Sequence, residues 1–278
     1  MEGIEHKVKE TVEKYDLISK KDNVLVACSG GKDSTTVLYI LNKLGYNVSA
    51  ITVDALIGNY TKQNLENLKR FCRKENIKLH VISFKKEFGA SLCYLRSILT
   101  QKGIKLNSCT ICGVLRRYLL NKYARKLKAD VVATGHNIDD EAQSILMNLF
   151  KNNIELLARL GPKTGIRKHK NFIPRIKPLY FVSEKEVIKF SKERKFLVNY
   201  NACPCRIDAY RNHVRKLLDR YEKENINVKK NIINSFLQVL PVLKKNFQTL
   251  KEPNVCNKCG EPSKNKVCMA CQILSKLK

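Results

Sequence analysis

The run SGGKDS at Ser29–Ser34 is the stretch of this chain best suited to phosphate chemistry. Gly30 and Gly31 carry no Cβ, so the backbone there can approach a ligand closely. Lys32 adds a positive charge, and the two serine hydroxyls add hydrogen-bond donors. These residue types at this spacing predict a loop that binds an anion.

The loop lies between a predicted strand and a predicted helix. Residues 24–28 form a short apolar run rich in β-branched side chains, which is typical of a buried strand. Residues 34–44 predict a helix, and Gly45 stands where a helix commonly ends. Since a helix N-terminus has free N–H groups and a positive dipole end, this order favours phosphate binding. The alternative is an ordinary turn between strand and helix.

The loop is not a Walker A sequence, because Lys32 is followed by Asp33 and not by Ser or Thr. It resembles the pyrophosphate loop of the N-type ATP pyrophosphatases, which split ATP into AMP and pyrophosphate. The resemblance implies that ATP binds here, with Lys32 and Asp33 placed near phosphates and Mg²⁺.

Eleven cysteines point to a second kind of chemistry. Cys109 and Cys112 stand three residues apart in a loop before a predicted helix, near Arg116 and Arg117, where thiols ionise readily. They could be a redox pair, half of a metal site or two buried small side chains, and a loop position disfavours burial. The run CPCR at 203–206 adds two thiols immediately before a basic segment.

The C-terminal cysteines have the spacing of a zinc knuckle. Cys256 and Cys259 are separated by two residues, as are Cys268 and Cys271, and eight residues separate the pairs. Tetrahedral zinc takes four thiolates at such spacing, with Gly260 relieving the turn. A short tail with no core of its own needs the metal to fold.

Two further segments carry charge. Asp139 and Asp140 follow Gly135 at the start of a predicted helix, where carboxylates favour the helix dipole. The alternative role is to hold Mg²⁺ on ATP phosphates, because magnesium prefers oxygen ligands. Residues 210–220 are basic and predict a helix that faces RNA, or alternatively a solvated basic surface.

Composition supports a phosphate-rich partner. The 278 residues contain 53 Lys and Arg against 25 Asp and Glu, a net charge of +28. Such an excess favours nucleic acid binding, although a generally basic surface is the alternative. No apolar run reaches the ~20 residues of a membrane span, and the N-terminus has no apolar signal core. We therefore expect a cytoplasmic protein with reduced thiols.

The elements that position these residues alternate between strand and helix. After the first strand, further strands are predicted at 48–53, 78–83 and 130–135, separated by helices near 65–75 and 115–127. This pattern predicts an α/β fold with a doubly wound parallel sheet. Ligands bind beyond the carboxyl ends of such strands. The residues expected to converge there are Ala27, Val53, Asp54 and Gly135.

We expect four segments along the chain. Residues 1–20 form an N-terminal helix, 21–182 an ATP pyrophosphatase domain, and 183–252 a basic helical region that faces tRNA. Residues 222–250 within it read as helix, Pro253 marks a boundary, and 253–278 form the zinc knuckle.

The block from Cys109 to Phe150, together with SGGKDS and the four-cysteine tail, resembles the tRNA 2-thiolation enzymes. These are the archaeal and eukaryotic wobble-uridine thiolases and the related enzymes that act at position 54. The resemblance covers residues 4–271 and implies that Cys109, Cys112 and Cys203 hold a [4Fe-4S] cluster with one iron left open. It also implies that Arg116, Gly135 and Asp140 belong to the ATP or catalytic set. The implied zinc ligands are Cys256, Cys259, Cys268 and Cys271.

Three departures from the family pattern matter. An N-terminal four-cysteine knuckle that usually precedes the first helix is not in this sequence. Asp54 is followed by Ala-Leu-Ile, where the family often has Glu-Gly-Ile, so any role of that glutamate is lost. Cys205 stands where members commonly carry tyrosine, and its thiol could compete with Cys203 as a ligand or block the open iron.

The expected reaction is ATP-dependent replacement of a uridine C2 oxygen by sulfur in tRNA, first of all at wobble position 34. Position 54, cytidine 2-thiolation and a persulfide route through Cys112 and Cys203 without a cluster are the enzymatic alternatives. The non-enzymatic alternative is a tRNA-binding subunit with an inactive ATP site. Sulfur would come from a ubiquitin-like thiocarboxylate protein or inorganic sulfide, and a homodimer or a paralogous subunit is a further expected partner.

Overall fold

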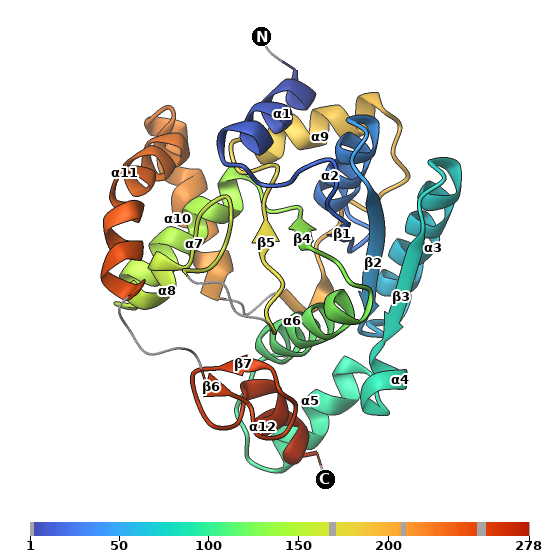
Figure 1. The fold of residues 1–278 in the computed structure, drawn as a ribbon. Helices are drawn as coiled ribbons and strands as arrows, with labels where there is room; N and C mark the ends of the chain where they lie inside the picture. The colour runs from blue at the N-terminus through green and yellow to red at the C-terminus, as the bar shows by residue number, and fades with distance from the viewer. Residues whose placement is uncertain (1–2, 167–170, 207–209, 249–253, 278) are drawn as a thin grey trace.

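A five-stranded parallel sheet forms the centre of the molecule, with strands in the order β3-β2-β1-β4-β5 (Figure 1). The computed structural model describes residues 3–166, 171–206, 210–248 and 254–277. Strand order reverses between β1 and β4, which creates the crevice where ligands bind in such sheets. The predicted doubly wound parallel sheet is confirmed. The strands are β1 (Val24–Ala27), β2 (Val48–Asp54), β3 (Leu79–Ser83), β4 (Val131–Thr134) and β5 (Arg175–Ile176).

Helices cover both faces of the sheet. Successive strand residues point to opposite faces, so each strand contributes to two hydrophobic clusters. In β1, Val24 and Val26 pack into one hydrophobic cluster and Leu25 into another. Helices α1 (Ile4–Lys14), α2 (Lys32–Lys43), α3 (Gly58–Lys74) and α9 (Glu184–Glu193) contribute to the first cluster. Helices α4 (Phe84–Phe88), α5 (Leu92–Gln101) and α6 (Ser108–Lys126) contribute to the second.

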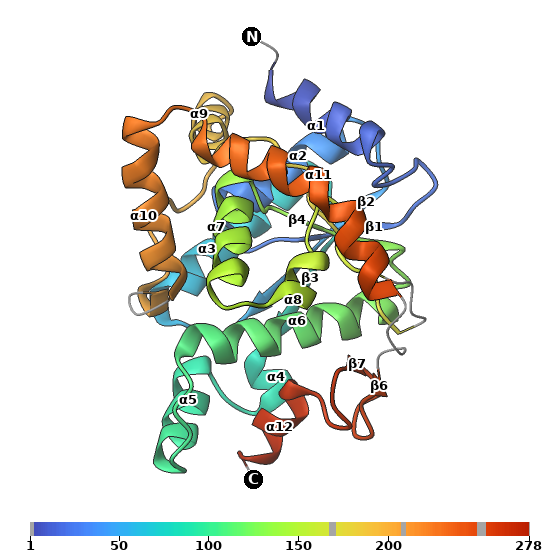
Figure 2. The same cartoon turned by 90° about the vertical axis from the view of Figure 1, so that its left-hand side faces the viewer.

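A group of helices packs beyond the β5 edge of the sheet (Figures 1 and 2). Buried Ile145 and Leu157 pack there against Phe236 and Leu240. The group consists of α7 (Ile138–Phe150), α8 (Ile154–Ala158), α10 (Tyr210–Glu224) and α11 (Val228–Gln248). Within the described residues, no helix is both long and apolar enough to cross a membrane.

The C-terminal knuckle docks against α6 (Figure 2). It contains β6 (Asn254–Val255), β7 (Pro262–Ser263) and α12 (Met269–Ser275). Its buried Ile273 shares a hydrophobic cluster with Leu115 and Leu119 of α6. The carboxylate of Glu261 accepts hydrogen bonds from Asn121 and Arg125 of the same helix. The hydrophobic side chains of the tail are therefore buried against α6.

Several predicted boundaries were wrong. Helix α6 begins at Ser108, so Cys109 and Cys112 lie in its first turns and not in a loop, because the Asn107 side chain caps the helix by accepting from Thr110 N. Helix α3 begins at Gly58 and not near residue 65. The predicted helix 222–250 is divided, since α10 ends at Glu224 and α11 begins at Val228. The expected boundary at Pro253 lies outside the described residues.

Candidate active site

The SGGKDS loop joins β1 to α2 as predicted, and its shape depends on glycine. Gly30 has φ +80°, a left-handed conformation that other residues rarely adopt. A Cβ on Gly30 would also stand 2.4 Å from the carbonyl oxygen of Asn64. Gly31 is the N-cap of α2, and among the described residues no side chain caps this helix. Its first N–H groups are thus left available for an anion.

An ion-pair network surrounds Lys32 at the first turn of α2. Its Nζ lies 2.9 Å from Asp33 Oδ2 and 2.9 Å from Glu184 Oε1. The other oxygen of Glu184 pairs with Arg215 of α10. Burial lowers the pKa of Lys32, but the two carboxylates outweigh it and hold the pKa above its ordinary value. Lys32 is therefore charged and fixed in direction, with one N–H left for a phosphate oxygen.

Asp33 and Asp140 lie side by side in this network. Asn137 Nδ2 donates to Asp33 Oδ1 at 3.0 Å, and Asn137 and Asp140 form a capping box at the start of α7. Burial raises the pKa of both carboxyl groups, and the charge of Asp140 raises that of Asp33 further. Asp140 thus has the predicted capping role, and its partly exposed carboxylate can also meet a cation. Asp139 is instead held by Lys229, 2.6 Å away.

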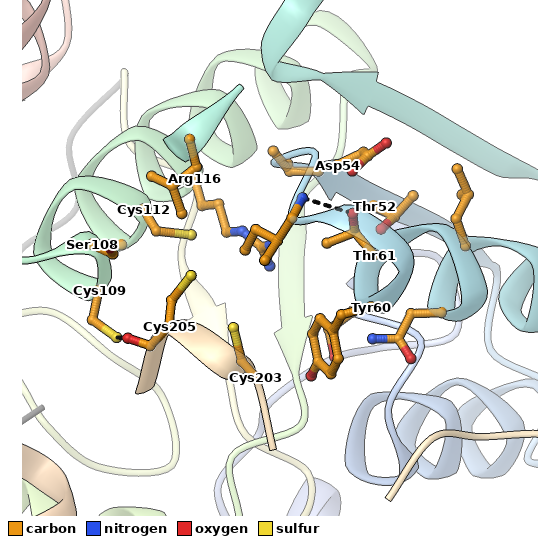
Figure 3. Close-up of a pocket in the computed structure, with 17 residues that line it drawn as sticks. Thr52, Asp54, Tyr60, Thr61, Ser108, Cys109, Cys112, Arg116, Cys203 and Cys205 are labelled. Carbon is orange, nitrogen blue, oxygen red and sulfur yellow. Dashed lines mark hydrogen bonds between the residues drawn. The ribbon is translucent and has the colours of Figure 1, made fainter. Parts of the chain in front are cut away.

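The cysteines predicted for a cluster meet the nucleotide side of the sheet in one cavity of about 270 Å³. Cys109 and Cys112 come from α6, while Cys203 and Cys205 come from the segment before and within the short turn η1 (Pro204–Arg206). The wall shared with the predicted ATP site consists of Ser29, Thr52, Val53 and Asp54. Figure 3 shows the Arg116 side chain running into the space between the cysteines and Thr61.

Contacts at the thiols fix the cysteine segment. Cys109 Sγ donates to the carbonyl oxygen of Cys205 at 3.2 Å (Figure 3). Burial raises the pKa of the Cys112 thiol, and the neighbouring positive charge of Arg116 opposes that shift. Among the described residues, these thiols do not form a group tight enough for a single metal ion. A wider, multi-iron cluster suits thiols that line one cavity from two segments.

The other predicted ATP residues lie beside this cavity and not in its wall. Ala27 ends β1 next to Thr134 of β4. Gly30, Gly31, Lys32, Asp33, Ser34, Gly135 and Asp140 form the adjoining loop and ion network. Glu184 was not predicted, and Arg211 and Arg215 were expected only on the basic helix that faces RNA and not in this ion network. The capping sequence Ser183-x-x-Glu186, which places Glu184 in a first turn, was the available signal.

The four C-terminal cysteines form a separate group. Their sulfur atoms all lie within 4.8 Å of one another, and Cys259 Sγ and Cys268 Sγ are 3.6 Å apart. A Zn–S distance of about 2.3 Å places tetrahedral ligands about 3.8 Å apart, so the group fits zinc. Gly260, with φ +72°, makes the predicted turn.

The fold and the loop define a class of ATP-binding protein, the PP-loop proteins. The family profile described as a PP-loop domain matches residues 1–221. The chain belongs to this PP-loop family, in the group that contains the tRNA 2-thiolation proteins.

Relatives of the chain carry related names. It is 32% identical over 272 residues to tRNA-5-methyluridine(54) 2-sulfurtransferase of Pyrococcus horikoshii, covering 98% of this chain and 84% of the relative. It is 33% identical to cytoplasmic tRNA 2-thiolation protein 1 of Laccaria bicolor, covering 98% and 77%. The structure is similar to that of the U34-tRNA thiolase NcsA from Methanococcus maripaludis with its [4Fe-4S] cluster. That match has a TM-score of 0.82 and 29% identity, and covers 99% of this chain and 87% of the other.

Proposed function

We propose that this protein is an ATP-dependent tRNA 2-sulfurtransferase. The observation that carries the proposal is the single cavity that joins the end of β2 and Ser29 on one wall to Cys109, Cys112 and Cys203 on the other. An enzyme that activates a base with ATP and then adds sulfur needs its ATP site and its sulfur-carrying group next to the same base. The names of the relatives support the same reaction.

The reaction proceeds in two steps. The uridine C2 oxygen attacks the α-phosphorus of ATP, an O–P bond forms, and the bond to pyrophosphate breaks. Negative charge grows on the leaving pyrophosphate, and the N–H groups at the start of α2, Lys32 and the hydroxyl of Ser29 stabilise it. A sulfur nucleophile then attacks C2, and AMP departs with the former C2 oxygen. Arg116, which points into the cavity, offers donors to the charged groups there.

The chain's own residues fit the cofactors that this reaction uses. Cys109, Cys112 and Cys203 would hold a [4Fe-4S] cluster, which supplies an iron site for sulfur when bound. Asp33 and Asp140 would hold Mg²⁺ beside the phosphates, because both are carboxylates in one network. The four-cysteine group of the C-terminal knuckle, which packs against α6, would hold structural zinc.

Wobble position 34 is the target we favour, since the structural neighbour is a U34-tRNA thiolase. Position 54 is the second candidate, because the Pyrococcus relative is named for it. We expect the protein to act in the cytoplasm, as the fungal relative's name states of that protein. A ubiquitin-like thiocarboxylate protein or sulfide would supply sulfur, with a second copy or a paralogue as a possible subunit. Mapping the thiolated nucleotide in tRNA from a deletion strain separates the two positions.

The test of the function is AMP formation that depends on tRNA. Wild-type protein should convert ATP to AMP and pyrophosphate only with tRNA present. Asp33→Ala should abolish AMP formation and leave tRNA binding intact, since it removes a charge at the phosphate site alone. Normal AMP release by Asp33→Ala would refute the loop assignment, and no AMP from wild type would favour the non-enzymatic subunit.

A further inference from the structure

Three arginines from three different elements converge beside the active site. Arg117 lies on α6, Arg175 on β5 and Arg211 on α10. Arg175 Nη2 donates to the backbone carbonyl of Arg117 at 3.4 Å, and the ring of Phe172 lies 5.6 Å from the Arg175 guanidinium carbon. Burial lowers the pKa of Arg117, the neighbouring Cys112 opposes that shift, and the positive charge of Arg211 adds to it.

One of the three arginines has a carboxylate nearby, since Arg211 Nη1 lies 3.8 Å from Asp140 Oδ1. Within the described part of the chain, neither Arg117 nor Arg175 forms an ion pair with a carboxylate. The carboxylate that acts on Arg175 is Glu261, which is already bonded to Arg125. Burial, together with the positive charge of Arg117, lowers the pKa of Arg175 to about 10. Like charges held together in this way are stabilised by an anion from outside.

The position of the cluster narrows the choice of anion. The Arg117 guanidinium would stand 3.3 Å from a Cβ placed on Gly113, the residue after Cys112. Arg211 donates to the backbone oxygen of Asp140 at 3.2 Å and to Ser144 Oγ at 3.0 Å. The arginines therefore lie between the thiol end of the site and the carboxylate at the ATP end. Figure 2 shows α10 and the start of α6 on the same side of the molecule.

We propose that Arg117, Arg175 and Arg211 bind one phosphodiester of the RNA chain next to the target nucleotide. This inference rests on the proposed function. The planar guanidinium group binds phosphate oxygens with two parallel hydrogen bonds, which lysine cannot do. ATP has its own phosphate site at the start of α2 with Lys32. A fixed backbone phosphate at this point would direct the neighbouring base, once unstacked, into the cavity.

The test uses the salt dependence of tRNA binding by the full-length protein. The variants are Arg117→Gln, Arg175→Gln and the double variant, with exposed Arg73 of α3 changed to Gln as the control. Each neutralised phosphate contributes about 0.7 to 0.9 to the slope of log K against log salt. Each single variant should lose only part of this contribution, because the remaining arginines still meet the phosphate, and the double variant should lose more, up to the share of one phosphate. Arg73→Gln should keep the wild-type slope. Arg175→Lys should also keep the wild-type slope, because lysine retains the positive charge.

A second arm leaves the protein unchanged, so it does not depend on folding of a variant. Wild-type protein should lose the full contribution of one phosphate to the slope when tRNA carries a neutral methylphosphonate linkage beside the target uridine. The Gln variants should lose nothing more with that RNA. A wild-type slope in the double variant, or an unchanged slope with the neutral linkage, would overturn the proposal. Weaker ATP binding by the variants without RNA would also overturn it and assign the arginines to the triphosphate.

Failure of the proposed function can be distinguished from failure of the phosphodiester site. If wild-type protein does not thiolate tRNA but the slopes change as stated, the phosphodiester site stands and the reaction is wrong. If wild-type protein thiolates tRNA and the slopes do not change, the reaction stands and the site is wrong.

Discussion

Gly135 lies so close to Ser34 that a Cβ on Gly135 would stand 2.7 Å from the backbone nitrogen of Ser34. It would also stand 2.8 Å from the carbonyl carbon of Asp33. Gly135 follows β4, and Ser34 lies in the first turn of α2, so this contact sets how the phosphate loop sits against the neighbouring strand. The atoms that a Cβ on Gly135 would meet belong to the backbone, so no flexible side chain could move aside.

Gly135→Ala should therefore weaken ATP binding without unfolding the sheet. Overpacking of this kind costs about 1–3 kcal/mol, and the strain falls on the phosphate loop. Equilibrium binding of ATP measures the effect, which should be about tenfold or more. Gly3→Ala is the matched control, because nothing lies within 4 Å of a Cβ there. ATP affinity equal to wild type in Gly135→Ala would contradict the described contact.

Glu184→Gln should tighten pyrophosphate binding. The Glu184 carboxylate is 2.9 Å from Lys32, so a bound phosphate shares that ammonium with a like charge. Removing the charge also breaks the ion pair with Arg215, which keeps its second pair with Asp219. After allowance for solvent screening, the gain is about 1 kcal/mol, or about fivefold in affinity.

Inhibition by pyrophosphate, or calorimetric titration with it, measures this change. The control is Glu193→Gln at the end of the same helix, where the ion pair with Lys189 is exposed. It should leave the affinity unchanged. Weaker pyrophosphate binding in Glu184→Gln would show that the carboxylate acts mainly by orienting Lys32 and not by repulsion.

The zinc assignment predicts about one zinc per chain, held by the C-terminal cysteines. The double variant Cys256→Ser, Cys259→Ser should lose the metal and melt at a lower temperature, because the knuckle then leaves the apolar surface of α6 uncovered. Metal analysis and thermal unfolding measure both effects. Cys93→Ser, at an exposed cysteine outside this group, should keep zinc and stability. Equal zinc in the double variant and wild type would refute the assignment.

Local sequence was enough to predict the sheet and the phosphate loop. Strand runs such as 24–28 and the hexapeptide at Ser29–Ser34 are continuous in the chain, so their periodicity and glycine content are visible directly. The zinc group is equally local, because its four ligands span only residues 256–271. The short helices α4 and α8 were not predicted, since five residues carry too little periodicity.

Contacts between distant segments could not be predicted from local pattern. Glu184 meets Lys32 across 152 positions, and Glu261 meets Asn121 across 140. The loop predicted for Cys109 and Cys112 was wrong because Asn107, a preferred N-cap residue, starts the helix one residue before Cys109. The convergence of Arg117 with Arg175 required the packing of α6 against β5.

The identity of the third cluster ligand tests the central claim most directly. Cys203 and Cys205 both line the cavity with Cys109 and Cys112. The carbonyl oxygen of Cys205 also accepts a hydrogen bond from Cys109 Sγ. The proposal assigns Cys203 as the ligand, and thiolate-ligated clusters should absorb broadly near ~400 nm.

The measurement is absorption near ~400 nm together with tRNA thiolation after anaerobic reconstitution, in wild type, Cys203→Ser and Cys205→Ser. We expect wild type and Cys205→Ser to show both signals, and Cys203→Ser to lose both. Loss of both in Cys205→Ser with Cys203→Ser unaffected would show that the wrong thiol was assigned. Full thiolation by aerobic, iron-free wild-type protein would contradict the cluster mechanism and favour a persulfide.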